Sequence, residues 1–274
     1  WTALTSRYNW GDGVNVATAH WFQINPATGA LLWHTFLGGT AEDIGWSVYV
    51  DTAGTLYVGG GSGGATAGSF GWGSPVSALN ASSFSGAWLA KLDAATGALS
   101  WHSFSNSLNP TGSQTASAAA ITTDASGNIY TAGNGGNDAE LMKFNSTGTR
   151  QYAAVLPAGS DTGKGIATDG TYLYVGGSAT GSFGTTINRA YGGLQDGYVA
   201  KVLASNGSTL SWVTFLGNAG GDTVWGMSMD ASGNLYATGG SASTWGTPLN
   251  AFGGGTQDGW LVKLNSSGIL QWST

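Results

Sequence analysis

One short pattern recurs four times and limits the folds open to this chain more than any other feature. It occurs as DTAGTLYVGGG from residue 51, DASGNIYTAGN from 124, DGTYLYVGGS from 169 and DASGNLYATGG from 230. In three copies an aspartate precedes a glycine by three residues: Asp51 and Gly54, Asp124 and Gly127, Asp230 and Gly233. This spacing predicts a type I turn, with the aspartate capping the backbone and the glycine at positive φ.

The turn belongs to a longer unit with four short apolar segments. In the last unit these are residues 225–230, 234–240, 259–265 and 269–274. They are rich in β-branched and aromatic residues, are bounded by Gly, Asn, Asp and Ser, and have no helical spacing. We therefore expect four β-strands in each unit.

The spacing of these units predicts an all-β fold. The fourth segments carry Trp33, Trp101, Tyr152, Trp212 and Trp272, which are separated by 68, 51, 60 and 60 residues. A four-stranded unit at about this period is typical of a β-propeller. We expect one domain over residues 1–274 with five blades of four-stranded antiparallel sheets. The blades are predicted at about 1–36, 45–104, 118–155, 165–215 and 225–274.

The full pattern, FLGG…D.SGNLY.TG.S…GG.QDG.L.KLN.SG.L.WST, resembles the bacterial and archaeal β-propeller repeats of the SBBP type. The resemblance covers residues 19–274 and is weakest in the unit near 118–155, which lacks the long loop between its second and third strands. Residues 1–18 do not match. The resemblance implies a secreted or surface-exposed propeller, and it transfers no active site.

Composition excludes several classes of function. Only 8% of the residues are charged, with 8 basic and 14 acidic side chains, so the chain lacks the clustered cations of a nucleic-acid surface. No apolar run approaches the roughly 20 residues that span a bilayer, and we predict no membrane insertion. The absence of cysteine excludes disulfides and thiolate metal sites. We predict no cofactor and no metal.

Four asparagines lie in glycosylation sequons: Asn80, Asn145, Asn206 and Asn265. In a secreted protein of a glycosylating organism they are candidate acceptors. A chain this rich in Ser, Thr and Asn also contains sequons by chance, so both interpretations stay open.

Long loops and blade-to-blade links are expected on one face of the predicted disc, and this face is our candidate surface for a ligand or partner. Its candidate residues are Trp46, Trp72, Trp225, Trp245, Asp43 and Asp222, with Asp196 and Asp258 beside them. Trp46 and Trp225 begin equivalent first strands, where we expect packing between blades and keep ligand contact as the alternative. For Trp72 and Trp245, in the middle of loops, the two alternatives are even.

No residue pattern supports catalysis. The chain has no G-x-S-x-G elbow, and His20, His34 and His102 lack the close spacing of metal ligands. A lysine recurs at one position of the third strand in four of the five units, which favours a structural role over a singular catalytic one: Lys91, Lys143, Lys201 and Lys263.

The functional hypothesis is a non-catalytic extracellular or cell-surface module that associates with itself, as a subunit of a filament or sheath. The last unit supplies its own fourth strand, whereas the first has only residues 1–18 for its inner strands. These residues either fold into the first blade or pair with a neighbouring molecule. A carbohydrate-binding propeller is the alternative, and a propeller enzyme is the third hypothesis.

Overall fold

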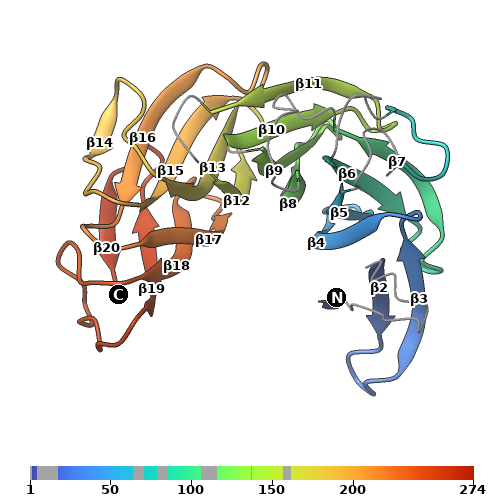
Figure 1. Cartoon of the computed structure of the whole chain (residues 1–274), viewed down its shortest axis with the longest axis horizontal. Helices are drawn as coiled ribbons and strands as arrows, with labels where there is room; N and C mark the ends of the chain where they lie inside the picture. The colour runs from blue at the N-terminus through green and yellow to red at the C-terminus, as the bar shows by residue number, and fades with distance from the viewer. Residues whose placement is uncertain are drawn as a thin grey trace. The chain divides into compact units, whose positions relative to one another are not determined.

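A computed structural model of the chain describes residues 2–4, 18–63, 71–78, 85–105, 116–136, 138–156 and 162–274. These residues form twenty β-strands, which confirms the all-β prediction (Figure 1). Among them no helix is long and apolar enough to cross a membrane. The chain separates into two compact units, Trp1–Gly136 with Met142–Ala153 and Asn137–Leu141 with Ala154–Thr274.

The described strands form five sheets, which we number in chain order. The first sheet contains β1 (Thr2–Leu4), β2 (Ala19–Ile24) and β3 (Leu31–Leu37). The second contains β4 (Glu42–Val50), β5 (Leu56–Gly63), β6 (Ser85–Leu92) and β7 (Leu99–Phe104). The third contains β8 (Ser117–Thr123), β9 (Ile129–Gly135), β10 (Asp138–Phe144) and β11 (Arg150–Val155).

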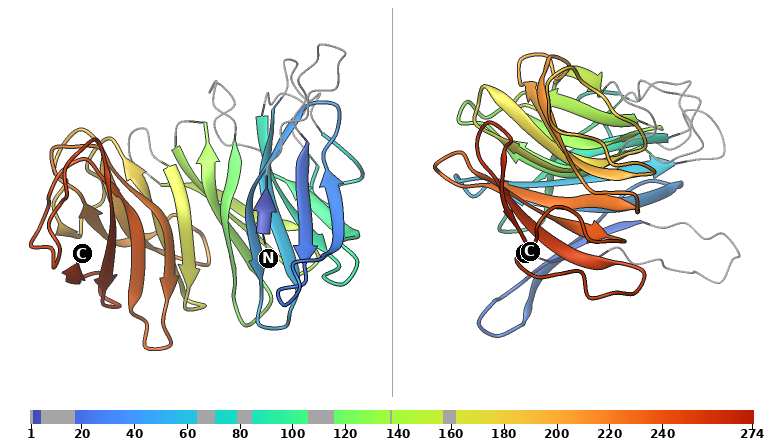
Figure 2. Two further views of the ribbon diagram at one scale, coloured as in Figure 1. Left: turned by 90° about the horizontal axis from the view of Figure 1, so that it is seen from below. Right: turned by 90° about the vertical axis from the view of Figure 1, so that its left-hand side faces the viewer.

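The fourth sheet contains β12 (Thr162–Thr168), β13 (Tyr172–Ala179), β14 (Ile187–Arg189), β15 (Asp196–Leu203) and β16 (Leu210–Leu216). The fifth contains β17 (Asp222–Met229), β18 (Leu235–Ser241), β19 (Asp258–Leu264) and β20 (Leu270–Ser273), in orange and red in Figure 2. Strands pair with their neighbours in sequence, except that β14 adds to the far edge of the fourth sheet, parallel to β16.

The N-terminal strand answers one question that the sequence left open. Thr2–Leu4 pairs antiparallel with β2 of its own chain, as the first of the two alternatives predicted. Residues 5–17 lie outside the described part.

Within each unit, consecutive sheets bury apolar side chains against each other. Trp21 and Trp33 of the first sheet share a buried cluster with Trp88 and Leu92 of the second. In the other unit, the corresponding cluster joins the fourth and fifth sheets. Burial of such side chains contributes about 1.5–3 kcal/mol each, so these clusters are the main source of stability.

The repeated turn has the predicted conformation. Gly54, Gly127 and Gly233 have φ of +81°, +77° and +78°. The Gly54 amide donates to the Asp51 carbonyl at 2.9 Å, and the Asp51 carboxylate accepts the Thr55 amide at 2.7 Å. The same two bonds recur at the turns that start with Asp124 and Asp230.

A β-bulge interrupts the first strand of the second to fifth sheets at the same position. The extra residues are Trp46, Ala119, Lys164 and Trp225. At each bulge a carbonyl oxygen of the first strand lies close to one residue of the second strand. A Cβ on that second-strand residue would overlap the oxygen. Glycine occupies that place each time: Gly60, Gly133, Gly177 and Gly239. This explains why glycine follows the tyrosine of every repeated motif by three residues.

Candidate functional site

The two mid-loop tryptophans of the candidate face are buried. Trp72 and Trp245 expose only 8% and 6% of their surface. Trp72 stacks on His102 with ring centroids 3.9 Å apart, and Trp245 meets Trp260 edge to face at 5.5 Å. Both side chains therefore pack against rings of their own sheets, so the structure favours packing over ligand contact, the two alternatives that the sequence left even.

The two first-strand tryptophans differ from expectation in the opposite direction. Trp46 is 52% exposed and Trp225 is 48% exposed, so neither is buried between sheets as we expected. Each is the extra residue of its bulge, and a bulge turns a side chain away from the regular alternation of the strand. These two indoles remain candidates for ligand contact.

The candidate carboxylates Asp43 and Asp222 are buried and have partners inside the protein. Asp43 accepts the Gly39 amide at 2.8 Å and the Ser62 hydroxyl. Asp222 accepts the Asn218 amide at 2.9 Å and the Ser241 hydroxyl. Burial raises the pKa of both carboxyls. Through these hydrogen bonds the two carboxylates hold the links before β4 and β17 in place. Neither carboxylate is exposed to a ligand.

Asp196, in β15 of the fourth sheet, is a third buried carboxylate, and its charge interacts with that of Asp222 in the fifth sheet. Asp196 accepts the Gly192 amide at 2.6 Å, and burial raises its pKa to about 6, with a further contribution from the charge of Asp222. Arg189 offsets these charges in part while its guanidinium donates to the carbonyls of Phe215 and Gly217, at 2.9 Å each. The sequence placed Asp196 on this face, but gave no signal for Arg189.

The repeated lysines contact tyrosine rings on the adjacent second strand. The ammonium groups of Lys143, Lys201 and Lys263 lie 5.4, 5.2 and 5.4 Å from ring centroids. The tyrosine partners are Tyr130, Tyr174 and Tyr236, whose hydroxyls donate to the turn carboxylates Asp124, Asp169 and Asp230. A repeated Asp–Tyr–Lys arrangement accounts for these lysines structurally.

The described histidines do not form a metal site. His102 Nε2 lies 2.7 Å from the Trp72 carbonyl oxygen, and His20 and His34 meet edge to face at 5.4 Å. In the part of the chain that the structure describes, no group of three or more His, Asp or Glu residues could hold a metal.

Three of the four sequon asparagines have a local role in turns. The side chains of Asn145, Asn206 and Asn265 accept backbone amides within their own turns. Asp93 makes the same contacts in the second sheet, so turn geometry alone explains a short polar residue here. Asn80 lies outside the described residues, and glycosylation stays a prediction.

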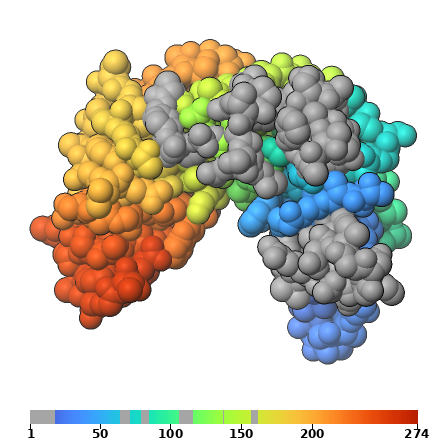
Figure 3. Space-filling view, viewed as in Figure 1, coloured from blue at the N-terminus to red at the C-terminus, as the bar shows by residue number. Residues whose placement is uncertain are grey.

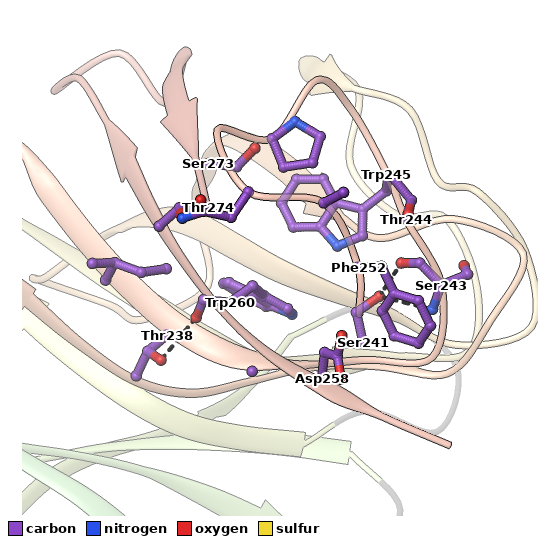
Figure 4. A pocket seen from close by; sticks show the side chains of 15 residues that line it. Thr238, Ser241, Ser243, Thr244, Trp245, Phe252, Asp258, Trp260, Ser273 and Thr274 are labelled. Atoms are coloured by element: carbon purple, nitrogen blue, oxygen red, sulfur yellow. Dashed lines mark hydrogen bonds between the residues drawn. The ribbon is translucent and has the colours of Figure 1, made fainter. Parts of the chain in front are cut away.

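A cavity of about 410 Å³ lies beside the fifth sheet (Figure 4). Its lining includes Trp245, Phe252, Trp260 and Thr274, with Asp258 as the one carboxylate. No histidine or lysine lines it. The cavity combines aromatic rings with hydroxyl groups, which is the usual lining of a site that binds a small molecule or a side chain. The cavity could not be predicted from the sequence, because its walls come from a loop and the end of a strand.

Neither a family model nor a curated protein matches the sequence. Among solved structures, the chain is similar to a quinohemoprotein alcohol dehydrogenase of Pseudomonas putida HK5 (14% identity, TM-score 0.45) and to Drosophila Plexin A in complex with Semaphorin 1b (10%, 0.47). These matches cover 86% and 96% of this chain, but only 36% and 52% of the other chains. An exo-1,5-α-L-arabinanase from a bovine ruminal metagenomic library matches at 11% identity and a TM-score of 0.39, with 82% of this chain and 76% of that chain covered. Likenesses at this level assign no function.

Proposed function

We propose that this chain is a non-catalytic, five-bladed β-propeller module of the SBBP repeat type, which acts outside the cell and associates with copies of itself. The proposed contact is a face of the first sheet. One observation carries the proposal: this face of aromatic and aliphatic side chains is exposed or half-buried, whereas the same face of the second sheet is fully buried.

We call this surface the first-sheet face and define it by His20, Phe22, Ile24, His34 and Phe36. The four rings of this face lie close together: the centroid of the His20 ring is 4.3 Å from that of Phe36, on which it stacks, and 6.0 Å from that of Phe22. Phe36 is 52% exposed. Part of the first sheet lies at the surface in blue in Figure 3. A contiguous apolar face of this kind is typical of an interaction site.

The repeat identifies what this face is suited to contact. The residues at equivalent positions of the second sheet are Trp88, Ala90, Leu92, His102 and Phe104, and all of them are buried. Trp21 and Trp33, on the opposite side of the first sheet, share a buried cluster with Trp88, Ala90, Leu92 and Phe104. His102 is covered by Trp72 from the loop of its own sheet. By analogy, the first-sheet face fits the opposite side of another sheet of the same repeat.

The fifth sheet offers such a side. Leu261 is 39% exposed, whereas its counterparts Leu89 and Val199 are fully buried against the following sheet. The first-sheet face of one molecule and this surface of another would form a head-to-tail contact. Such a contact does not need to close, so it can build a filament or sheath.

Sedimentation velocity over a wide concentration range tests the proposal. We expect the mass of the wild-type chain to increase with concentration, and Phe36→Lys to abolish the increase. Leu249→Lys is the matched control, because Leu249 is 75% exposed but lies in a loop of the fifth sheet. A wild-type chain that stays monomeric at millimolar concentration would overturn self-association.

Carbohydrate binding is the second candidate function, and the exposed indoles of Trp46 and Trp225 favour it. Exposed aromatic rings at repeated positions are suited to stacking on sugar rings. A glycan array distinguishes the two functions: binding that is lost in both Trp46→Ala and Trp225→Ala, with a monomeric wild type, would replace self-association by a lectin function.

A further inference from the structure

The fourth and fifth sheets, which belong to the same unit, meet where β15 and β17 begin. Gln195 and Gly221 form a parallel bridge there, and the Asp222 amide donates to the Gln195 carbonyl at 2.9 Å. We call this contact the sheet seam. It consists of residues 192–196 of the fourth sheet and residues 217–222, which link the fourth sheet to the fifth.

Each side of the sheet seam contributes one fully buried carboxylate, Asp196 or Asp222. A Cβ on Gly217 would lie 2.8 Å from Asp196 Oδ1 and 2.6 Å from Asp222 Oδ2, so these two oxygens lie beside the same point. Asp222 Oδ2 accepts the Asn218 amide at 2.9 Å, whereas Asp196 Oδ1 accepts no hydrogen bond from the residues that the structure describes. The two facing oxygens therefore have fewer donors than two buried negative charges require.

The guanidinium of Arg189, on β14, is engaged away from the two carboxylates. It donates to the carbonyls of Phe215 and Gly217, at 2.9 Å each, and lies 5.0 Å from the Trp245 ring. Its positive charge acts on both carboxyls at longer range. With both carboxylates ionised, one negative charge of this buried group stays without an offset.

The other titratable side chains at this end of the two sheets leave the pair unaffected. None of them changes the pKa of Asp196 or Asp222: Lys164 of β12, Tyr191 of the loop, Tyr198 of β15 and Asp258 of β19. Burial raises the pKa of both carboxyls, and the charge of Asp222 contributes to raising that of Asp196 to about 6. One proton on Asp196 therefore offsets the remaining charge at mildly acidic pH.

We propose that Asp196 and Asp222 form a pH-sensitive latch between the fourth and fifth sheets, in which a single proton on the pair holds the sheet seam closed and its loss loosens the seam. When both groups are ionised, two like charges face each other in a buried site, and movement of residues 217–222 that admits water relieves them. Because the closed seam binds the proton more tightly than the open one, opening becomes more favourable as the pH rises through the pKa of Asp196. This opening is local and does not involve the first-sheet face.

The seam between the first and second sheets is a control within the same chain. Asp43 stands where the fifth sheet has Asp222, and both accept a serine hydroxyl of their second strand. Thr18 stands where the fourth sheet has Asp196, as the registers of the third and fourth strands show. In the described residues, this seam therefore has a buried carboxylate on one side and a hydroxyl residue on the other.

Hydrogen exchange of the full chain at pH 5 and pH 7.5 tests the latch. An acid with a pKa of about 6 in the closed seam and 3.8 in the open one changes the opening equilibrium about tenfold over this range. We expect the protection factors of residues 217–222 to fall about tenfold from pH 5 to pH 7.5, and those of residues 38–43 in the control seam to change less. In Asp196→Asn, which has no proton to lose, the fall should disappear. Equal protection at both pH values in the wild type, or a fall that persists in Asp196→Asn, would overturn the proposal.

Carboxyl ¹³C NMR adds a readout that a merely structural role would not move. The Asp196 signal, assigned by its absence from Asp196→Asn, should titrate near pH 6 in the wild type and at lower pH in Asp222→Asn, because the facing charge is then gone. Asp43→Asn is the matched control, since it removes the equivalent carboxylate of the second sheet and should leave the Asp196 titration unchanged. An Asp196 signal that titrates near pH 3.8 in the wild type, or that Asp222→Asn does not move, would overturn the latch.

Discussion

Replacement of Gly239 by alanine tests whether the bulge determines the repeated glycine. A Cβ at Gly239 would overlap the Thr223 carbonyl oxygen and would lie 2.9 Å from its carbon and 2.5 Å from Trp260 Cζ2. The carbonyl is main chain and the indole is packed in the core, so neither can move freely. One strand must therefore shift away from the other.

The expected cost follows from two overlaps. Overpacking in a core costs about 1–3 kcal/mol for each site, and the alanine recovers about 0.4–1 kcal/mol by restricting the unfolded chain. We expect a net loss of about 3 kcal/mol in the free energy of unfolding. For a chain of this size, that lowers the melting temperature by about 6–12 °C.

The matched control is Gly226→Ala in the same pair of strands. A Cβ at Gly226 meets nothing closer than the Thr238 methyl group at 4.0 Å. Its alanine variant should melt at or slightly above the wild-type temperature. Calorimetry or circular dichroism measures both variants. If Gly239→Ala and Gly226→Ala melt within about 1 °C of each other, the bulge does not require the glycine.

Three further predictions concern the turn and the charged residues. Gly233→Val should lower the free energy of unfolding by about 1–3 kcal/mol and Gly233→Asn by less, because asparagine tolerates positive φ; equal losses in denaturant titrations would contradict this. The pKa of Asp196 rises from 3.8 to about 6 on folding, so the native state binds more protons between these values and stability falls as pH rises through this window. Asp196→Asn should flatten this part of the pH profile of unfolding, and an unchanged profile would exclude Asp196 as its source. Lys201→Met should cost less than about 1 kcal/mol and leave any self-association intact, since its ammonium lies over the rings of Tyr172 and Tyr174 and interacts with the charge of Asp169 in its own sheet; a folded variant that no longer associates would give this lysine a functional role.

Local features of the fold could be predicted from the sequence because their causes are local. The turn from Asp51 to Gly54 needs only its own aspartate and glycine, and it formed as predicted. The alternation of apolar segments and turn residues likewise predicted strands, and the structure has them at these segments. The fifth strand of the fourth sheet, Ile187–Arg189, was not predicted. It forms by parallel pairing across the outer edge with β16, and nothing within the three residues specifies that partner.

Side-chain burial on the candidate face could not be predicted, because it depends on one extra residue in each first strand. An uninterrupted strand would have kept Trp46 and Trp225 in the regular alternation, whereas the bulge turns them outward. The repeated glycine was the available signal. Glycine inside a strand marks a bulge or a close backbone approach, and Gly60 and Gly239 stand opposite the bulges that expose these two indoles. The bulge that requires glycine on one strand is therefore the same feature that exposes a side chain on its neighbour, so this position of the repeat can vary from Trp46 to Ala119 or Lys164 without disturbing the core.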